Sequence, residues 1–407
     1  MSLEQLSSYL AKINFPCDLN KLPKNAYLVG GSVRDALLGR YKIPLDLDFV
    51  LPDEVIKTAK KIANLYDAGF VVLDAEREIA RVVFEQGTLD LARQEGETLE
   101  IDLQRRDFTI NAIAFNLQNQ ELVDPLGGLP DLAQKNLRMV STQNLEDDPL
   151  RLLRAYRQAA QLEFEIESNT RQAICDRATL IKTVAAERVQ AELNYLFAAS
   201  QGNRWLIAAT EDGLLQPWLP HINPEKVHHL NRVQDAIKVS IDLGLNLPEL
   251  EMLSKLASLV DTDANIAITE LSQLKYSRAQ IKAVSTTVQY LPELQTRTMP
   301  MSLREQYFWF LAVKDVLPIL MVRAIATNVA NQIIEPLIKR YLDQQDPVVY
   351  PRPLITGNDL INELEIKPSS LLGTILTEVQ IAQIESKVCT RHEAITWASS
   401  LLINHQE

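Results

Sequence analysis

The sequence predicts an α+β protein in which a small mixed α/β head at the N-terminus is followed by an all-α neck, body and tail. Residues from about 21 to 140 alternate short β-like runs with stretches of helical period. From about residue 146 glycine becomes scarce and strand signals disappear, whereas the helical period continues to the C-terminus. Prolines at 217–224 and at 300 interrupt the helical part. We therefore expect a head at 1–145, a neck at 146–220, a body at 221–300 and a tail at 301–407.

The bulk composition limits the kinds of partner. A net charge of −12 over 407 residues argues against holding nucleic acid by bulk attraction, but it leaves room for a local basic groove. Cys17, Cys175 and Cys389 are far apart and odd in number, so they give neither a disulfide framework nor a zinc spacing. No apolar run approaches the length of a membrane span. We expect a cytoplasmic protein with no membrane partner.

The first candidate site begins where an apolar run, Tyr27–Val29, stops at Gly30 and Gly31. Ser32 is predicted to cap the short helix that follows the glycines. A helix start offers unpaired backbone N–H groups, and these groups suit a phosphate. The turn therefore predicts a phosphate site.

Two aspartates follow the turn on a predicted strand at 45–51, which reads LDLDFVL. Because side chains alternate along a strand, Asp46 and Asp48 lie on the same face. Paired carboxylates suit Mg²⁺, and phosphoryl transfer with two metal ions needs acids that bridge the ions. A solvated pair on a half-buried strand is the alternative. Together with the glycine turn, the pair predicts that the protein handles a nucleoside triphosphate.

The combined pattern, G-G-x-V-R-D at 30–35 and D-x-D at 46–48, resembles the nucleotidyltransferase superfamily of DNA polymerase beta. It is more similar to the tRNA CCA-adding and poly(A) polymerase branch. The resemblance implies that Asp46 and Asp48 are catalytic and bind Mg²⁺. It also suggests a third metal ligand, Asp90, for which a surface acid is the alternative. The triphosphate would be held by Gly30, Gly31, Ser32, Arg34 and Arg106.

A second motif, RRDFTINA at 105–112, resembles the family segment that contacts the triphosphate and ribose. The planar fork of Arg106 suits phosphate oxygens, and Asp107 would accept from a ribose hydroxyl. Asn111 belongs to the same nucleotide-binding run and begins a predicted strand at 111–117. A solvated rim of two adjacent arginines is the alternative.

A third motif repeats charged residues at steps of three along one helical face, namely Asp148, Arg151, Arg154 and Arg157. A solvent-facing stripe with internal ion pairs is the alternative. The segment resembles the family's E-D-x-x-R motif, which implies that Asp148 and Arg151 read the base of the incoming nucleotide. Cytosine offers an amino donor to a carboxylate and two acceptors to a guanidinium, and uracil reverses the first of these. Arg154 would hold a phosphate, and Asp147 replaces the usual Glu.

Two later stretches extend the resemblance. AERVQAEL at 186–193 resembles the neck motif E-R-x-x-x-E-L, in which Glu187, Arg188 and Glu192 are predicted to join neck helices by ion pairs. Residues 354–373 resemble the tail segment, which implies that the tail grips tRNA.

The resemblance implies an RNA nucleotidyltransferase that adds CMP to the 3′ end of tRNA in CCA-end synthesis or repair and releases pyrophosphate. Its partners are tRNA and CTP, with ATP left open. Only residues 91–104 separate the Asp90 strand from Arg105, whereas full CCA-adding enzymes carry a longer loop there. The short segment resembles the CC-adding subgroup, which leaves the last A to a separate A-adding enzyme. A poly(A) polymerase and a degenerate RNA-binding protein are the alternatives.

Overall fold

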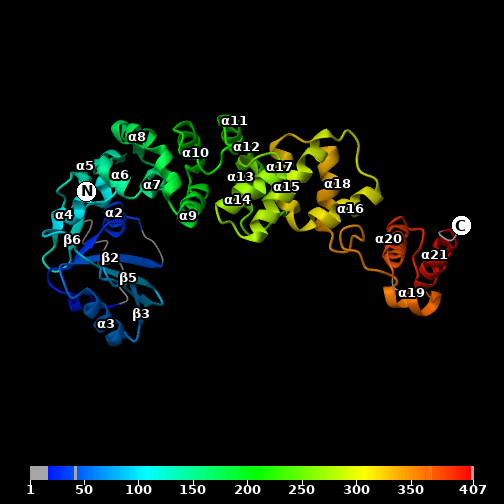
Figure 1. Ribbon diagram of the computed structural model, residues 1–407, viewed down its shortest axis with the longest axis horizontal. Coiled ribbons are helices and arrows are strands. Elements are labelled where there is room, and N and C mark those ends of the chain that lie inside the picture. Colours follow the sequence, from blue (N-terminus) through cyan, green and yellow to red (C-terminus); the bar gives the residue numbers. More distant parts are fainter. Residues whose placement is uncertain (1–16, 41–43, 366, 368, 405–407) are drawn as a thin grey trace. The chain divides into compact units, whose positions relative to one another are not determined.

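The computed structural model describes residues 17–40, 44–365, 367 and 369–404. The chain divides into two compact units, Met1–Pro217 and Trp218–Glu407. The first unit holds a sheet and helices, and the described part of the second is helical (Figure 1). The α+β prediction is thus confirmed, whereas the boundaries after 145, 220 and 300 stay predictions.

A seven-stranded sheet forms the head, with strand order β3-β4-β5-β2-β1-β6-β7 (Figure 1). The strands are β1 (Tyr27–Val29), β2 (Leu45–Leu51), β3 (Gly69–Asp74), β4 (Ile79–Phe84), β5 (Gly87–Arg93), β6 (Ala114–Asn116) and β7 (Glu121–Val123). β2 and β5 are parallel, and every other neighbouring pair is antiparallel. Leu47 and Phe49 are buried while Asp46 is exposed, so β2 has the predicted alternation.

The helices of the head are α2 (Gly31–Leu37), α3 (Val55–Tyr66), α4 (Leu99–Gln104) and α5 (Gly128–Gln134). α3 buries Val55, Ala59, Ile62 and Ala63, which recur at the spacing of one helical face. This face packs against β3, β4 and β5. The helix that follows the acid-bearing strand therefore covers this side of the sheet with an apolar face.

Two sequence predictions are wrong in detail. Residues 111–117 are not one strand, because Asn111 ends a 3₁₀ helix, η2 (Thr109–Asn111), and only β6 is extended. Residues 111–116 of that run are all buried, so they carry no period that separates a strand from a helical turn. Strands also do not stop at residue 146, because β9 (Glu165–Ile166) pairs in parallel with β8 (Asn136–Leu137). A pair of two-residue strands is too short to show alternation.

The helices that follow the head in the first unit are α6 (Thr142–Asp147), α7 (Leu150–Leu162), α8 (Ser168–Cys175), α9 (Ala186–Phe197) and α10 (Gly202–Glu211). α7 is the central one, since it packs against both α9 and α10. It buries Leu152, Leu153, Tyr156 and Ala160. The packing of this apolar face fixes the direction in which the polar face of α7 points.

The second unit contains α11 (Pro224–His228), α12 (Leu230–Asp242), α13 (Leu250–Leu259), α14 (Ala264–Gln273), α15 (Arg278–Thr296), α16 (Leu303–Val313), α17 (Leu317–Ala326), α18 (Asn331–Leu342), α19 (Gly357–Leu364), α20 (Ser370–Ile384) and α21 (Arg391–Asn404). α17 reads LPILMVRAIA and is buried almost throughout, with α12, α13 and α15 packed around it. α19, α20 and α21 share a smaller core. Within the described residues, no helix is both long and apolar enough to span a bilayer.

The close pairing of β2 with β5 can be tested at Gly87. This residue has φ +156°, and a Cβ there would lie 2.0 Å from the Leu45 carbonyl oxygen. Because that oxygen belongs to the backbone, we expect Gly87→Ala to lower the free energy of unfolding by about 3 kcal/mol. Differential scanning calorimetry would show this as a lower Tm.

Gly373→Ala is the matched control, because a Cβ there meets nothing within 4 Å and the residue lies inside α20. It should raise the stability by about 0.5 kcal/mol. A Gly87→Ala protein that melts like the unaltered chain would contradict the register of β2 on β5.

Candidate active site

The two acids of β2 lie beside the glycine turn. Gly30 has φ +71°, and a Cβ at this position would lie 3.9 Å from Asp48 Oδ2. Ser32 Oγ donates to the carbonyl oxygen of Asp46 at 2.8 Å and so ties the turn to β2. Asp46 and Asp48 share one face of the strand. The structure therefore brings the acids and the turn together, as the sequence predicts.

The start of the helix differs from the prediction. α2 begins at Gly31 with Gly30 as its N-cap residue, so the prediction that Ser32 caps this helix is wrong. Gly30 has a positive φ, which a residue with a side chain rarely adopts. The Ser32 hydroxyl is instead used to hold β2.

Asp48 lies in a crowded acidic environment. Burial, together with the neighbouring carboxylates of Asp46 and Asp90, raises the pKa of Asp48 to about 6. Asp46 accepts a hydrogen bond from the Thr88 hydroxyl on β5. Carboxylate oxygens that crowd in this way are the ligands that hard divalent cations prefer. The donor chemistry of the pair thus fits a divalent metal ion.

Asp90 stands directly opposite Asp48 in the parallel register of β2 and β5. Both of its carboxylate oxygens accept from Arg81, at 2.7 Å each. Among the described residues, no group of three His, Cys, Asp or Glu side chains is placed to hold a metal ion. The role of Asp90 as a third ligand stays a prediction.

Arg106 faces the glycine turn from the other side. Its Nη1 would lie 3.1 Å from a Cβ at Gly30. Its Nη2 donates to the buried carboxylate of Asp102 at 3.2 Å, which also accepts from Arg105. Arg106 Nε is buried and has no hydrogen-bond partner among the described residues. The guanidinium is therefore anchored at one edge and still has a donor to offer.

Arg34, Asp107 and Asn111 meet in a buried network beneath the turn. Arg34 Nη1 donates to Asn111 Oδ1 at 2.8 Å, and Asn111 Nδ2 donates to Asp107 Oδ1 at 2.9 Å. Gln158 of α7 closes the network by accepting from Asn111 at 3.0 Å and from Arg34 at 3.3 Å. The three predicted residues are brought together, but they bind one another.

The environment of Asp107 sets its charge. Burial alone raises its pKa, but the Arg154 guanidinium and the hydrogen bond from Asn111 outweigh burial, so the pKa of Asp107 is lowered. Arg154 Nη1 lies 3.5 Å from Asp107 Oδ2. Asp107 is therefore ionised at neutral pH and links η2 to α7.

The predicted base-reading residues lie at the start of α7. Asp148 precedes the helix, and its Oδ2 is ion-paired with Arg188 of α9 at 3.0 Å. Arg151 Nη1 donates to the carbonyl oxygens of Arg105 at 2.8 Å and Asn144 at 3.0 Å. The Arg151 backbone N–H donates to the Asp148 carbonyl oxygen at 3.0 Å, but the two side chains form no ion pair with each other. Each is fixed by a different part of the first unit.

The two later arginines of the same face meet α9. Arg154 Nε donates to Glu192 Oε1 at 3.3 Å, and Arg157 Nε donates to the other carboxylate oxygen of Glu192. Glu192 therefore makes ion pairs between α9 and α7, and Arg188 joins α9 to Asp148 just before α7, as the neck motif predicts. Within the described residues no ion pair involves Glu187.

The sequence reasoning missed several residues of this site, among them Asp102, Thr88 and Gln158. Gln158 carries a signal that was available, since it lies four residues after Arg154 and thus on the same helical face. Asp102 and Thr88 carry none, because only the folded chain brings them to Arg106 and Asp46.

Three family models match the chain. Residues 26–138 match the poly A polymerase head domain. Residues 163–226 match the probable RNA and SrmB-binding site of polymerase A. Residues 249–398 match the putative tRNA nucleotidyltransferase domain 2.

The chain also resembles characterised proteins over nearly its whole length. A CC-adding tRNA nucleotidyltransferase from Synechocystis sp. is 47% identical over 97% of this chain and 98% of that protein. An A-adding tRNA nucleotidyltransferase from Deinococcus radiodurans is 29% identical over 92% of this chain and 95% of that protein. The structure of the Thermotoga maritima CCA-adding enzyme complexed with tRNA has the same fold, with a TM-score of 0.72 and 20% identity over 98% of each chain.

Gln158 tests the buried network. Gln158→Leu removes the acceptor of Arg34 and Asn111 and leaves buried polar groups unpaired. We expect the free energy of unfolding to fall by about 2 kcal/mol, measured by urea denaturation.

Gln172→Leu on α8 is the control, because its side chain is exposed and bonds only to Asp176. It should change the stability by about 0.5 kcal/mol or less. Equal effects of the two substitutions would show that Gln158 does not hold the network.

Proposed function

The chain belongs to the tRNA nucleotidyltransferase family, and on that premise we propose that it adds CMP to the 3′ end of tRNA in the synthesis or repair of the CCA end, with release of pyrophosphate. The observation that carries this proposal is the meeting of Asp46 and Asp48 with the Gly30 turn and Arg106. Acids that hold a metal ion, next to donors for phosphate oxygens, are what nucleotidyl transfer requires.

Nucleotidyltransferases of this family use a divalent metal ion, and we propose Mg²⁺ held by Asp46 and Asp48. When bound, the metal would stabilise negative charge on the attacking and leaving oxygens. Thr88 positions the Asp46 carboxylate by donating to it. Asp90 accepts from Arg81 through both carboxylate oxygens and would complete the metal site as a third ligand.

Phosphate binding would combine the backbone of residues 30–32 with the free edge of Arg106. Arg106 is pre-oriented by Asp102, so little side-chain entropy is lost when it meets the triphosphate. Arg34 is also a proposed nucleotide-site residue, but its guanidinium is buried and donates to Asn111. We propose that Arg34 positions the glycine turn and does not contact the phosphates.

Base selection would rest on Asp148 and Arg151. A cytosine amino group would donate to Asp148, and the Arg151 guanidinium would donate to the ring acceptors. Asp148 Oδ2 is ion-paired with Arg188, which orients the carboxylate that would accept such a donor. Uracil would place an acceptor against Asp148, and an unpaired polar contact of that kind costs about 1–3 kcal/mol.

The connection after β5 bears on the number of nucleotides added. β5 runs to Arg93 and α4 starts at Leu99, so only residues 94–98 are irregular. No long loop follows the strand, which supports CC addition followed by a separate A-adding enzyme. ATP remains the open second substrate. A poly(A) polymerase is the second candidate, since the head also matches that family model.

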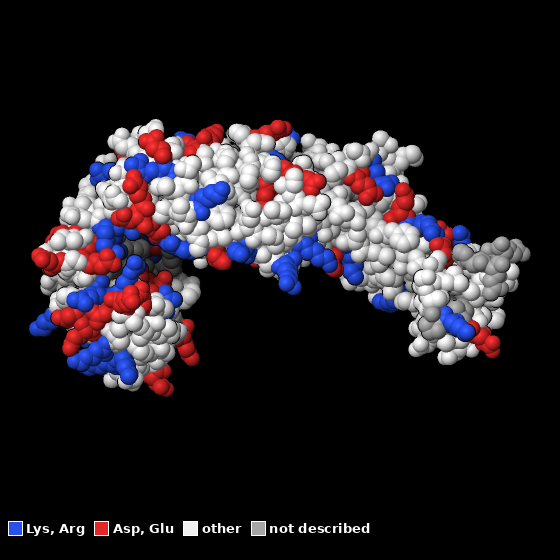
Figure 2. Space-filling model, viewed as in Figure 1, with Lys and Arg blue, Asp and Glu red and all other residues white. Residues whose placement is uncertain are grey.

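We propose further that the chain works in the cytoplasm and binds tRNA through its helical second unit. The three cysteines are free, which supports a reducing compartment. On the face shown in Figure 2, acidic and basic side chains are interspersed over the first unit, and basic side chains follow the lower edge of the second. Local basic groups of this kind permit RNA binding by a chain of net charge −12.

The acid pair gives a direct prediction. Asp46→Asn and Asp48→Asn should each lower CMP incorporation into tRNA that lacks its 3′ end by about 10³-fold, because each removes a charged ligand. EDTA should abolish incorporation by the unaltered chain, and added MgCl₂ should restore it. Asp53→Asn is the control, since Asp53 is an exposed acid just beyond β2. Full activity in either β2 variant would show that this acid pair is not needed for the transfer, whereas no incorporation by the unaltered chain would favour the degenerate RNA-binding protein.

Asp148→Ala tests base selection. Loss of the carboxylate should lower kcat/KM for CTP by about 10- to 100-fold and leave UTP nearly unchanged, so the CTP preference falls. The measurement is single-nucleotide addition with each triphosphate. Asp147→Ala is the neighbouring control, because Asp147 is exposed and bonds only to Gln143. A CTP preference that survives Asp148→Ala would remove Asp148 from base reading.

Product length decides between the remaining activities. On tRNA that ends at its discriminator base, we expect two C residues with CTP alone and the same product when ATP is added. A third residue with both nucleotides would show full CCA addition. A long A tract on arbitrary RNA would show a poly(A) polymerase.

A further inference from the structure

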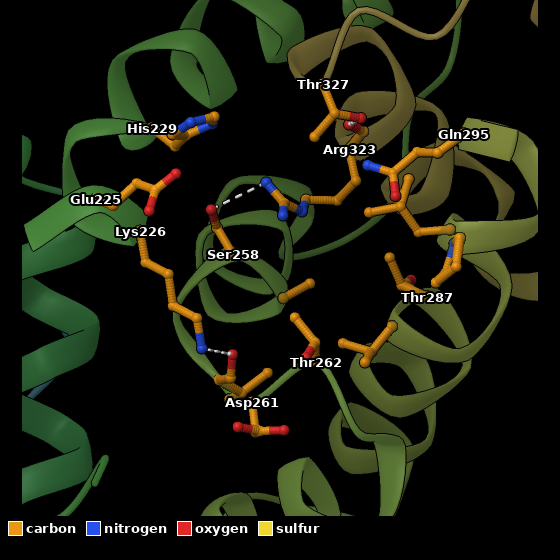
Figure 3. Close-up of a pocket in the computed structure, with 15 residues that line it drawn as sticks. Glu225, Lys226, His229, Ser258, Asp261, Thr262, Thr287, Gln295, Arg323 and Thr327 are labelled. Carbon is orange, nitrogen blue, oxygen red and sulfur yellow. Dashed lines mark hydrogen bonds between the residues drawn. The ribbon is translucent and has the colours of Figure 1, made fainter. Parts of the chain in front are cut away.

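A cavity of about 340 Å³ lies in the second unit, between α11, α13, α15 and α17 (Figure 3). None of its lining residues belongs to the proposed active site, which is built from the first unit. Its polar lining includes Lys226, His229, Thr262, Gln295 and Arg323. A cavity of this size is in the range of small-molecule sites.

Arg323 is the unusual residue of this cavity. It is the only charged residue of α17, and the side chain is only 9% exposed. Its Nη1 donates to Ser258 Oγ at 2.9 Å, whereas its Nε is buried without a partner among the described residues. Burial lowers the pKa of Arg323 to about 10. An apolar side chain would pack in α17 without this cost, so packing does not explain the arginine.

No carboxylate among the described residues forms an ion pair with Arg323. Asp261 and Glu225 also line the cavity, but Asp261 accepts from the Asp263 backbone N–H at 2.7 Å and faces His221 at 3.7 Å. Figure 3 shows Asp261 at the opposite end of the cavity from Arg323, and Glu225 on the wall across from it. The buried guanidinium is therefore not neutralised by any carboxylate in the part of the chain that the structure describes.

Further donors surround the same space. Lys226 Nζ donates to the Val260 carbonyl oxygen at 2.7 Å and keeps two more protons to offer. The side chains of His229, Thr262 and Gln295 make no hydrogen bond to another described residue. Figure 3 shows the Arg323 guanidinium pointing from α17 into the middle of this group.

We propose that this cavity binds a phosphate group, with Arg323 and Lys226 supplying the charge and Gln295, Thr262 and His229 supplying further donors. The guanidinium fork matches phosphate oxygens, and a phosphate has more acceptor sites than a carboxylate for the donors present. The phosphate group comes either from a small free phosphate or from an RNA backbone. The proposal goes beyond nucleotidyl transfer and does not depend on it.

The first measurement places the binding at this cavity. The full chain is labelled at histidine, the His229 NMR signal is identified with His229→Asn, and inorganic phosphate is titrated at fixed pH and ionic strength. We expect a saturable shift of the His229 signal. The apparent affinity for phosphate, taken from this titration, should fall at least about tenfold in Lys226→Gln and in Arg323→Gln, because each substitution removes a positive charge that would pair with phosphate. Because the Lys226 side chain is partly exposed, Lys226→Gln is expected to fold, so it tests the site even if Arg323→Gln unfolds.

The matched control is Lys238→Gln on α12, an exposed lysine that pairs only with Asp235. It should leave the titration unchanged. The second measurement is tRNA affinity by filter binding in the same variants. If Lys226→Gln and Arg323→Gln weaken tRNA binding and Lys238→Gln does not, the phosphate belongs to RNA. If Lys226→Gln and Arg323→Gln weaken the His229 response to phosphate but leave tRNA affinity unchanged, the ligand is a free phosphate.

The proposal is overturned if both variants match Lys238→Gln in the phosphate titration and in tRNA affinity. CMP transfer by the same preparations tests the proposed function separately, because the phosphate titration needs no catalysis. If the chain is inactive in CMP transfer and still shows the His229 response, phosphate binding in the cavity is supported and the proposed nucleotidyltransferase activity is refuted.

Discussion

The register of β2 between β1 and β5 is the constraint on which the first unit depends. Side chains alternate along a strand, so a slip by one residue would turn Asp46 and Asp48 into the core and expose Leu47 and Phe49. Burying two carboxylates without partners is far more costly than the native arrangement. The antiparallel pairing of Leu28 with Phe49 then fixes where β1 ends, so the glycine turn arrives beside Asp48. The positions of the two acids and of the glycine turn are thus set by one strand register.

The head and α7 are joined by ion pairs. Asp107, Arg154 and Glu192 form a chain of charges from η2 through α7 to α9. Partly buried ion pairs add little net stability, but removing one member leaves its partners uncompensated. This series of ion pairs therefore fixes the orientation of α7 more than it stabilises the fold. It holds the start of α7, with Asp148 and Arg151, in one orientation against the proposed nucleotide site.

The arginines of this protein separate into two groups by their partners. Arg34 and Arg157 donate to side chains of the protein, Arg34 to Asn111 and Arg157 to Glu192 and Gln161. Arg106 and Arg323 each keep a buried Nε without a partner among the described residues, one beside the glycine turn and one in the cavity of the second unit. Arg297 also has such an Nε, but its Nη2 donates to Glu293 and Glu305. Because a buried unpaired donor is costly, such positions are where a ligand gains most by binding. The same physical criterion thus points to both sites.

The sequence alone determined the α+β class, the acid pair and its common face, and the charged face of α7, because these follow from local periodicity and residue chemistry. It did not determine that Asn111 ends a 3₁₀ helix, since a continuously buried run has no period. Nor did it show that Gly30 rather than Ser32 caps α2, because the Ser32 hydroxyl is taken by the Asp46 carbonyl oxygen of another strand. Tertiary structure alone decided which partners Arg34 and Arg323 have. Hydrogen bonds between residues far apart in the chain depend on packing, and no local pattern encodes them.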